Sequence, residues 1–236
     1  MTKGLNPASH ASRLIAQIPA RSGSKRVPNK NLRLMNGKPM VAYALQAALR
    51  VTSIDRVVVN TDSDAIAEIS EAMGAETYMR PPELATDSTT GDEFTFDFIE
   101  KFNPDNVILV NPVCPLLTPS EIEAAIAVFF ERSEIDTLIT CSNTQMPVSF
   151  EGRFLNVAAG RPMKPTQENE PVSVLNFAIA IWESSSFRER YLSNRGAYLG
   201  HNRLLHQIPQ YTSVKVSNEE DFIVAERLLA AMYDGN

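Results

Sequence analysis

Hydrophobic positions along the chain form short uninterrupted runs rich in branched residues, and these runs alternate with longer stretches of helical period. Val57, Val58 and Val59 are consecutive rather than alternating with polar residues, which is the pattern of a strand covered on both faces. The branched runs predict strands at 13–19, 56–60, 76–79, 106–111, 136–141, 172–182 and 204–216. The helical periods predict helices at 39–50, 63–73, 92–102, 118–132 and 218–233. This alternation predicts an α/β fold with a mostly parallel, doubly wound sheet.

Residues 143–171 interrupt the alternation. Glycines and prolines break up this segment, and neither strand nor helix period continues through it. We interpret the segment as a small hairpin and loop insertion, rather than as a domain of its own. The sequence therefore predicts a single domain over residues 1–236.

The distribution of charge changes the picture that the net charge gives. Hydrophobic residues make up 44% and charged residues 21% of the chain, an ordinary globular composition that excludes intrinsic disorder. The net charge of −6 argues against nucleic acid as a partner. No acidic residue precedes Asp55, however, so the first 54 residues carry +9 and the remainder carries 13 basic against 28 acidic residues, or −15. Such concentration of positive charge suggests that the first segment holds an anion.

Cysteine, histidine and hydropathy counts restrict the compartment and the partners. The two cysteines, Cys114 and Cys141, have no metal-ligand spacing and fit small apolar packing positions in a reducing cytoplasm. The three histidines are scattered, so a zinc site is not predicted. No run of about eighteen apolar residues and no signal-peptide pattern is visible, so no membrane partner is expected.

The loop that follows the first predicted strand carries the most informative chemistry. Small residues around Gly23 would expose backbone amides to a phosphate group. The loop also contains four cations, Arg21, Lys25, Arg26 and Lys30. Its spacing matches neither a Walker loop nor a dinucleotide-binding fingerprint. The alternative is a solvated basic turn, but the combination of cations, glycine and serines favours a site for an anion such as a triphosphate.

Residue by residue, the loop from Ile18 to Asn31 resembles the signature of the nucleotide-sugar cytidylyltransferases. The similarity is greatest to the acylneuraminate cytidylyltransferase (CMP-sialic acid synthetase) family and its nonulosonate relatives, and it spans essentially the whole chain. The other matching elements are Asn-Gly-Lys-Pro-Met at 36–40, Asn-Thr-Asp-Ser at 60–63, Arg-Pro-Pro-Glu-Leu-Ala-Thr-Asp at 80–87 and Asn-Phe-Ala at 176–178.

The resemblance implies a Rossmann-like sheet of the nucleotide-diphospho-sugar transferase type and transfer of CMP from CTP to an acidic keto-sugar, with release of pyrophosphate. It also implies a magnesium ion and a homodimer in which the insertion at 143–171 reaches a partner. The residues it implies for the triphosphate are Arg21, Ser24, Lys25 and Lys30, and those for the base are Asn31 and Arg80. Further candidates are Ala20, Ser22, Gly23 and Asp62 for the nucleotide, Asn111 and Asn176 for the substrate, and Arg21, Lys30 and Lys215 for catalysis.

Two of these residues have structural alternatives. Asp62 follows a predicted strand, where open α/β sheets bind ligands, but it also precedes a predicted helix that it could cap. Arg80 faces the base if the resemblance holds, whereas the alternative is a surface ion pair with Glu76 or Glu83.

The chain departs from the family pattern near its carboxyl end. Family members have an Asp-x-Asp strand end that holds magnesium, and here Lys215 and Ser217 occupy the two carboxylate positions. An ammonium group repels magnesium, so no metal ligand is predicted, and magnesium is doubtful as a cofactor. Ser217 with Glu220 instead fits a capping box.

Two other departures lie at the expected acceptor side. The segment Asn-Pro-Val-Cys-Pro-Leu-Leu at 111–117 replaces Gln-Pro-Thr-Ser-Pro-Leu-Arg, and Phe177 replaces a glycine and would fill space near the sugar. Arg161 and Lys164 remain as basic candidates for the carboxylate of the sugar, although each also fits a plain surface charge.

Three hypotheses remain open from the sequence. The first is an active cytidylyltransferase in which Lys215 replaces one function of the metal, or in which the triphosphate carries the magnesium. The second is a nucleotidyltransferase with another sugar or nucleotide specificity. The third is a catalytically silent nucleotide-binding protein that keeps the fold.

Overall fold

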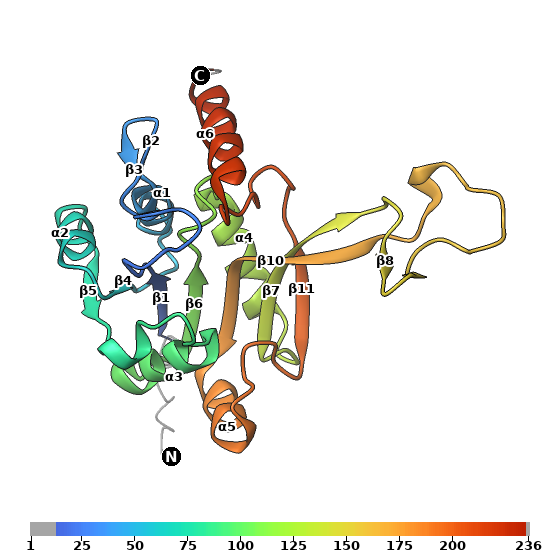
Figure 1. Cartoon of the computed structure of the whole chain (residues 1–236). Helices are drawn as coiled ribbons and strands as arrows, with labels where there is room; N and C mark the ends of the chain where they lie inside the picture. Colours follow the sequence, from blue (N-terminus) through green and yellow to red (C-terminus); the bar gives the residue numbers. More distant parts are fainter. Residues whose placement is uncertain (1–12, 235–236) are drawn as a thin grey trace, which may run out of the picture.

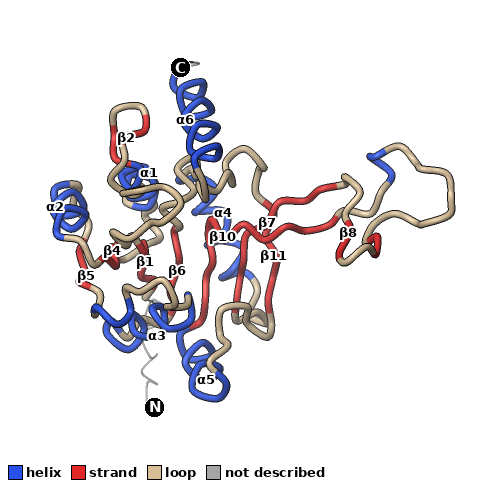
Figure 2. Tube along the Cα trace, viewed as in Figure 1, coloured by secondary structure: helices blue, strands red, loops and turns tan. Residues whose placement is uncertain are grey.

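The structure, a computed structural model, describes residues 13–234 and is built around a seven-stranded sheet (Figures 1 and 2). The strands of this sheet are β1 (Leu14–Pro19), β4 (Arg56–Thr61), β5 (Glu76–Met79), β6 (Asn106–Val110), β7 (Thr137–Thr144), β10 (Val172–Glu183) and β11 (Arg203–Gln207). The α-helices are α1 (Met40–Ala48), α2 (Asp64–Ala72), α3 (Gly91–Phe102), α4 (Pro119–Glu131), α5 (Ser184–Asn194) and α6 (Glu219–Asp234). Short 3-10 turns are η1 (Pro82–Leu84) and η2 (Thr166–Glu168), and the minor strands are β2 (Leu34–Met35), β3 (Lys38–Pro39), β8 (Ser149–Phe150) and β9 (Arg153–Phe154).

The sheet has the order β11-β7-β10-β6-β1-β4-β5 and is mostly parallel, as the sequence predicts. Its parallel pairs are β1 with β4, β1 with β6, β4 with β5, and β7 with β11. Strand β10 runs antiparallel to both β6 and β7. All five residues of β6 are buried, because helices cover both faces of this central strand.

Two hydrophobic clusters lie on opposite faces of the sheet. One combines alternate residues of β1 with side chains of α1 and α4, and the other combines Ile15 and Val58 with α3 and α5. A third cluster packs α6 and Val27 of the basic loop against the beginning of α1. Val27 is buried in this third cluster and so attaches the basic loop to the core.

Two elements differ from the sequence prediction. The predicted strand over 204–216 ends at Gln207, because Pro209 cannot continue a ladder and residues 209–213 form turns closed by Thr212 and Ser213. Helix α5 was not predicted, because most of its residues are polar. Its buried aromatic side chains are Phe187 and Tyr191, which lie one turn apart and pack against the sheet.

The segment predicted as an insertion forms an arm. Figure 2 shows β7 and β10 continuing beyond the rest of the sheet, and the β8–β9 hairpin lies toward the end of this arm. The main chain of the arm is fixed by Asn156 and Asn169, whose amides bond to the backbone of Met146, Glu170 and Gln145. The irregular segment is therefore a built hairpin and loop, as predicted.

The remaining sequence expectations about the core also agree with the structure. Cys114 and Cys141 are both buried and unpaired with each other. Burial raises the pKa of the Cys114 thiol to about 12, so this side chain behaves as an apolar residue. Within residues 13–234, no helix is both long enough and apolar enough to cross a membrane.

Candidate functional site

A cleft of about 560 Å³ lies where the basic loop meets the carboxyl ends of β1 and β6. This is the edge at which open α/β sheets bind ligands. The predicted site residues that line it are Arg21, Gly23, Ser24, Lys25, Lys30, Asn31, Arg80 and Asn111. Ala20, Ser22, Asp62, Asn176 and Lys215 do not line it. Arg26, Asp87, Phe94, Tyr198 and Ser217 complete much of the wall.

Asp62 holds the basic loop in place. Its carboxylate accepts hydrogen bonds from the Ser22 backbone N–H at 2.6 Å and from the Ser22 hydroxyl at 2.8 Å. The capping alternative for Asp62 is wrong, because the Ser63 side chain caps α2 by accepting from Ile66 N–H. Ala20 is buried, and its N–H donates to the Asn60 carbonyl. Ala20, Ser22 and Asp62 therefore position the loop rather than line the cleft.

Asn31 presents an unused acceptor. Its Nδ2 donates to the carbonyl oxygen of Arg21 at 2.9 Å, while its buried Oδ1 has no hydrogen-bond partner in the protein. A buried acceptor without a partner costs about 1–3 kcal/mol, so a ligand donor that reaches it gains correspondingly. The exocyclic amine of a base is such a donor.

Lys30 joins the basic loop to the segment before α6. Its Nζ donates to the carbonyl oxygen of Val216 at 2.9 Å. Burial, with added repulsion from Arg26, Lys215 and Arg21, lowers the pKa of Lys30 to about 8. The cleft thus holds a cation whose charge an incoming anion would stabilise.

Lys215 and Ser217 occupy neighbouring but different positions. Lys215 is exposed and lies outside the cleft lining, although its charge acts on Lys30, whereas Ser217 lines the cleft. The predicted capping box of Ser217 with Glu220 is wrong. Asp221 Oδ2 accepts from the N–H groups of Ser217 and Asn218, and Asn218 Oδ1 accepts from Asp221 N–H. The helix begins at Glu219, so Asn218 is the capping residue.

The side chains around the cleft do not form a resident magnesium site. Within the described residues, no group of three histidine, cysteine, aspartate or glutamate side chains is placed to hold a metal ion. Asp62 is bonded to Ser22, and Asp87 forms ion pairs with Arg21 and Lys25. Magnesium prefers oxygen ligands with at least one carboxylate, so this donor set does not fit the ion.

Arg80 is buried rather than paired on the surface. Its Nε donates to Asn60 Oδ1 at 2.8 Å and its Nη2 to the Asn60 carbonyl at 3.0 Å, while the guanidinium lies 4.7 Å from the centre of the Phe94 ring. Burial lowers the pKa of Arg80 to about 10. The predicted alternative, a surface ion pair with Glu76 or Glu83, is wrong, because Arg80 is buried, Glu76 pairs with Arg56, and within the described residues no ion pair joins Arg80 to Glu83.

A β-bulge shapes the opposite wall. The pairing of β10 with β7 shifts register between Leu175 and Ala180, and Phe177 has a φ of 52° within this bulge. The Phe177 carbonyl therefore accepts from Asn111 Nδ2 at 3.1 Å, and the Phe177 ring packs against Tyr198 with centroids 5.5 Å apart. Asn111 thus lies at the cleft with its amide already bonded.

Asn176, a predicted substrate residue, lies behind this wall. Its Oδ1 accepts from the Thr140 hydroxyl at 2.6 Å and from Ala178 N–H at 3.0 Å. Asn176 is buried and does not line the cleft. It therefore stabilises the bulge that places Phe177.

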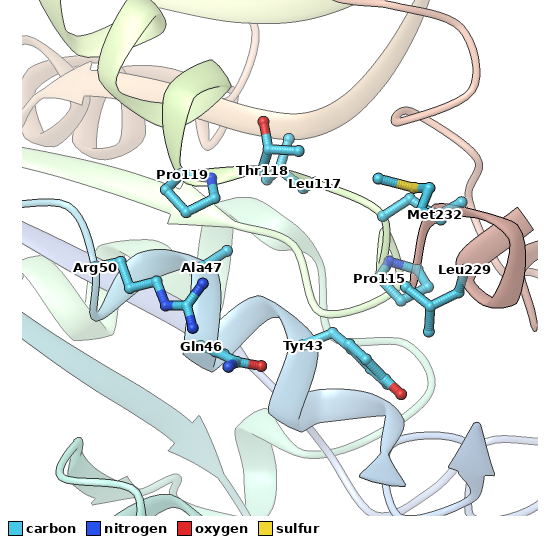
Figure 3. Close-up of a pocket in the computed structure, with 11 residues that line it drawn as sticks. Tyr43, Gln46, Ala47, Arg50, Pro115, Leu117, Thr118, Pro119, Leu229 and Met232 are labelled. Carbon is cyan, nitrogen blue, oxygen red and sulfur yellow. The ribbon is translucent and has the colours of Figure 1, made fainter. Parts of the chain in front are cut away.

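A second cleft, of about 180 Å³, lies between α1, the segment before α4, and α6 (Figure 3). Tyr43, Pro115 and Leu229 give it an apolar wall, and Arg50 is the cation among its lining residues. None of the predicted site residues lines it. The cationic cleft is therefore the candidate for an anionic ligand.

Sequence comparison decides the family. A sequence model described as Cytidylyltransferase matches residues 15–159. The chain belongs to the cytidylyltransferase family. It is 38% identical to the CMP-N,N'-diacetyllegionaminic acid synthase of Legionella pneumophila, over 92% of this chain and 96% of the relative. It is 28% identical to an N-acylneuraminate cytidylyltransferase of Streptococcus agalactiae, where 89% of this chain matches 51% of the relative. The chain thus spans about half the length of that relative.

Solved structures agree on the fold of this cytidylyltransferase. A CMP-2-keto-3-deoxy-manno-octonic acid synthetase complexed with CTP superposes with a TM-score of 0.68 at 19% identity, over 94% of this chain and all of that one. The 4-diphosphocytidyl-2C-methyl-D-erythritol synthase of Anaerococcus prevotii gives a TM-score of 0.66 at 15% identity, over 93% and 99% of the two chains. The predicted α/β, Rossmann-like fold and the predicted family are confirmed.

Sequence reasoning missed several residues of the cleft. Phe94, Asp87 and Tyr198 line it but carry no motif of their own. Asp87 is the last residue of the element at 80–87, and nothing in the sequence indicates that its acidic side chain faces Arg21 and Lys25. For Tyr198, the one sequence feature that could have indicated a packed ring nearby is the glycine at position 91. A Cβ at Gly91 would lie 2.7 Å from the Tyr198 ring, so the ring requires a glycine there.

Proposed function

We propose that this cytidylyltransferase transfers CMP from CTP to a hydroxyl group of an acidic keto-sugar of the nonulosonate class and releases pyrophosphate. The observation that supports it best is the convergence of Arg21, Lys25, Arg26 and Lys30 on one cleft at the carboxyl edge of the sheet. Four cations match the charge of a triphosphate. The relative with 38% identity is named for a diacetyllegionaminic acid product, which supports an acceptor of that chemical class.

The base end of the nucleotide lies toward Asn31 and Arg80 in this proposal. Asn31 Oδ1 is buried without a partner and accepts from the exocyclic amine of cytosine. Arg80 is fixed by Asn60 and supplies N–H donors to the base carbonyl. This pairing favours cytosine over uracil, because cytosine presents an amine and a carbonyl on either side of N3 on its pairing edge.

The triphosphate end lies against Arg21, Lys25 and Lys30. Attack of the sugar hydroxyl on the α-phosphorus forms a new P–O bond, releases the hydroxyl proton to solvent and breaks the bond to the β-phosphate, so negative charge develops on the departing pyrophosphate. Arg21 and Lys30 stabilise that charge, and Lys30 is held in place before the reaction by the Val216 carbonyl. The backbone around Gly23 and Ser24 contributes space and donors for close approach.

Magnesium enters this proposal only with the nucleotide. Residues 13–234 offer no fitting donor set, so a magnesium ion would be held mainly by the triphosphate oxygens and would neutralise charge on them. Lys215 takes part of the same role through its positive charge, which acts on Lys30 from outside the cleft lining. Transfer therefore depends less on the identity of the divalent ion than it would in an enzyme that binds the metal through its own carboxylates.

The acceptor and the second subunit are linked in this proposal. Arg161 and Lys164 lie on the arm and line a small cavity there, outside the cationic cleft of their own chain. The arm also exposes Phe150 and Phe154, each more than half accessible. We propose a homodimer in which these apolar side chains are covered and the arm of one copy brings its basic residues to the acceptor of the other. A monomer by light scattering contradicts this assembly.

The proposal also includes the cytoplasm as the compartment, supported by the two buried free cysteines.

The residues of the cationic cleft also fit a second candidate function, a nucleotide-binding protein without turnover. The exposed position of Lys215 and the absence of a fitting carboxylate set among the described residues favour that candidate.

Two experiments separate these functions. Isothermal titration with the four nucleoside triphosphates tests whether CTP is preferred, and product analysis by mass spectrometry after incubation with acidic keto-sugars tests for a CMP-sugar. Preference for CTP with a CMP-sugar product supports the proposal. Preference for another triphosphate indicates changed specificity, and CTP binding without a product from any acidic keto-sugar indicates a silent binding protein.

A further inference from the structure

Asp87 occupies the cations that the triphosphate is expected to use. Its Oδ1 lies 2.7 Å from Arg21 Nη2, and its Oδ2 lies 2.6 Å from Lys25 Nζ. Each oxygen of the carboxylate thus takes one cation. Asp87 also lines the cleft, so the contact lies inside the site rather than beside it.

A phosphate group and this carboxylate compete for the same donors. The N–H groups of Arg21 and the ammonium of Lys25 bind either anion with similar geometry. Two anions held together on the same pair of cations repel each other. A ligand phosphate that reaches Arg21 and Lys25 must therefore displace the Asp87 carboxylate.

The segment around Asp87 has few contacts that hold it in place. Residues 85–89 connect η1 to Thr90, the capping residue of α3, and they belong to no strand or helix. Apart from the ion pairs of Asp87, their side-chain hydrogen bonds are local, from the Thr86 hydroxyl to Ser88 and Thr89 and from Thr89 to the Glu83 carbonyl. By contrast, Arg80 on one side is buried and Thr90 on the other caps a helix. Few buried contacts allow this segment to open locally while its ends stay fixed.

We propose that Asp87 is an internal anion that holds Arg21 and Lys25 in the empty site, is displaced by the triphosphate, and returns as pyrophosphate leaves. The inference deepens the proposed function and rests on it for the identity of the ligand. The need to displace Asp87 weakens the binding of every ligand whose phosphates contact Arg21 and Lys25. The affinity for ligands that do not contact these two cations is unaffected. Asp87 thereby keeps pyrophosphate from remaining bound after transfer.

Titration calorimetry with inorganic pyrophosphate, CTP and cytidine in metal-free buffer tests this role. The Asp87→Asn variant should bind pyrophosphate and CTP about threefold to tenfold more tightly than the wild type, and cytidine equally well, because exposed ion pairs are individually weak. Glu83→Gln is the matched control. It removes one negative charge from the same segment, and Glu83 forms no ion pair within residues 13–234, so its effect on the affinity for pyrophosphate and CTP should be less than twofold.

A double-mutant cycle separates displacement from simple repulsion. If Asp87 only repels the ligand through space, the effects of Lys25→Gln and Asp87→Asn on pyrophosphate affinity add. If Asp87 is displaced, Lys25→Gln costs less affinity in the wild type than in Asp87→Asn, because removing Lys25 also releases one arm of the carboxylate. Additive effects overturn the proposal, and so does an unchanged pyrophosphate affinity in Asp87→Asn.

The outcomes also distinguish this inference from the proposed function. A wild type that forms a CMP-sugar but shows no gain in pyrophosphate affinity with Asp87→Asn overturns the role of Asp87 alone. A wild type that forms no CMP-sugar, with Asp87→Asn still binding pyrophosphate more tightly and with coupling to Lys25, overturns the proposed function and supports the role of Asp87. Pyrophosphate inhibition of turnover should likewise become severalfold stronger in Asp87→Asn.

Discussion

Lys30 Nζ lies 2.9 Å from the carbonyl oxygen of Val216. This hydrogen bond joins Lys30, a largely buried cation of the basic loop, to the segment that carries Lys215 and Ser217. The bond explains how Lys30 remains in place although burial disfavours its charge. It also places Lys215 close enough to affect the pKa of Lys30.

The lowered pKa of Lys30 predicts a pH dependence of CTP binding. Below about pH 8 Lys30 is protonated and attracts the triphosphate, and above it the free protein must take up a proton on binding. Affinity for CTP should therefore fall by about threefold to tenfold between pH 7.5 and pH 9.5. In Lys30→Arg the guanidinium stays charged, so this fall should disappear. Identical pH profiles for the two proteins contradict the assignment.

Restoring carboxylates at the carboxyl-end segment should change the dependence on metal. In the variant Lys215→Asp with Ser217→Asp, Ser217 already lines the cleft, so its replacement carboxylate would face the nucleotide. CTP affinity should become about tenfold or more dependent on magnesium, whereas the wild type should show a smaller difference between magnesium and a chelator. Equal magnesium dependence in both proteins, measured by calorimetry, would mean that these positions do not act on the metal.

The buried contacts of Arg80 predict a loss of stability on truncation. Arg80→Met leaves the buried Asn60 Oδ1 without its donor and leaves the Asn60 carbonyl with the Ala20 N–H alone, which should lower the free energy of unfolding by about 1–3 kcal/mol. Arg56→Met is the control, since Arg56 and Glu76 form an exposed pair worth at most about 1 kcal/mol. Urea unfolding measures both. Equal losses in the two variants would remove the distinction between a buried and a surface arginine.

Gly91 and Tyr198 give a prediction with an unusual sign. An alanine at an exposed helical position usually stabilises a protein relative to glycine, but a Cβ at Gly91 lies 2.7 Å from the Tyr198 ring, which also packs against Trp182. Gly91→Ala should therefore lower the free energy of unfolding by about 1–3 kcal/mol and alter the cleft wall. Adding Tyr198→Leu should reverse much of the effect of Gly91→Ala. An alanine that stabilises the wild type would show that Tyr198 yields freely.

The fold and the basic loop were predictable because their signals are local. Uninterrupted branched runs mark buried parallel strands, and the cations of the loop follow one strand within a few residues, so most of them reach one cleft. Helix α5 lacked such a signal because only two of its buried residues, Phe187 and Tyr191, are apolar, and the rest of its sequence is mostly polar.

The far wall of the site could not be predicted because it depends on tertiary contacts. Two capping patterns one residue apart, Ser217 with Glu220 and Asn218 with Asp221, are equally good in sequence, and only the start of α6 decides between them. Asn176 matched a family element, but a bulge turned its side chain toward Thr140. Asp87 looks like an ordinary surface acid until the fold brings it to Arg21.

The central claim is that the cationic loop holds CTP for transfer of CMP to an acidic keto-sugar. The most direct test measures pyrophosphate released from CTP in the presence of a nonulosonate such as diacetyllegionaminic acid, with wild-type protein and with Lys30→Met. We expect one pyrophosphate for each CMP-sugar formed, and a rate about a hundredfold or more lower in Lys30→Met. No pyrophosphate with any acidic keto-sugar, or equal rates in the two proteins, would contradict it.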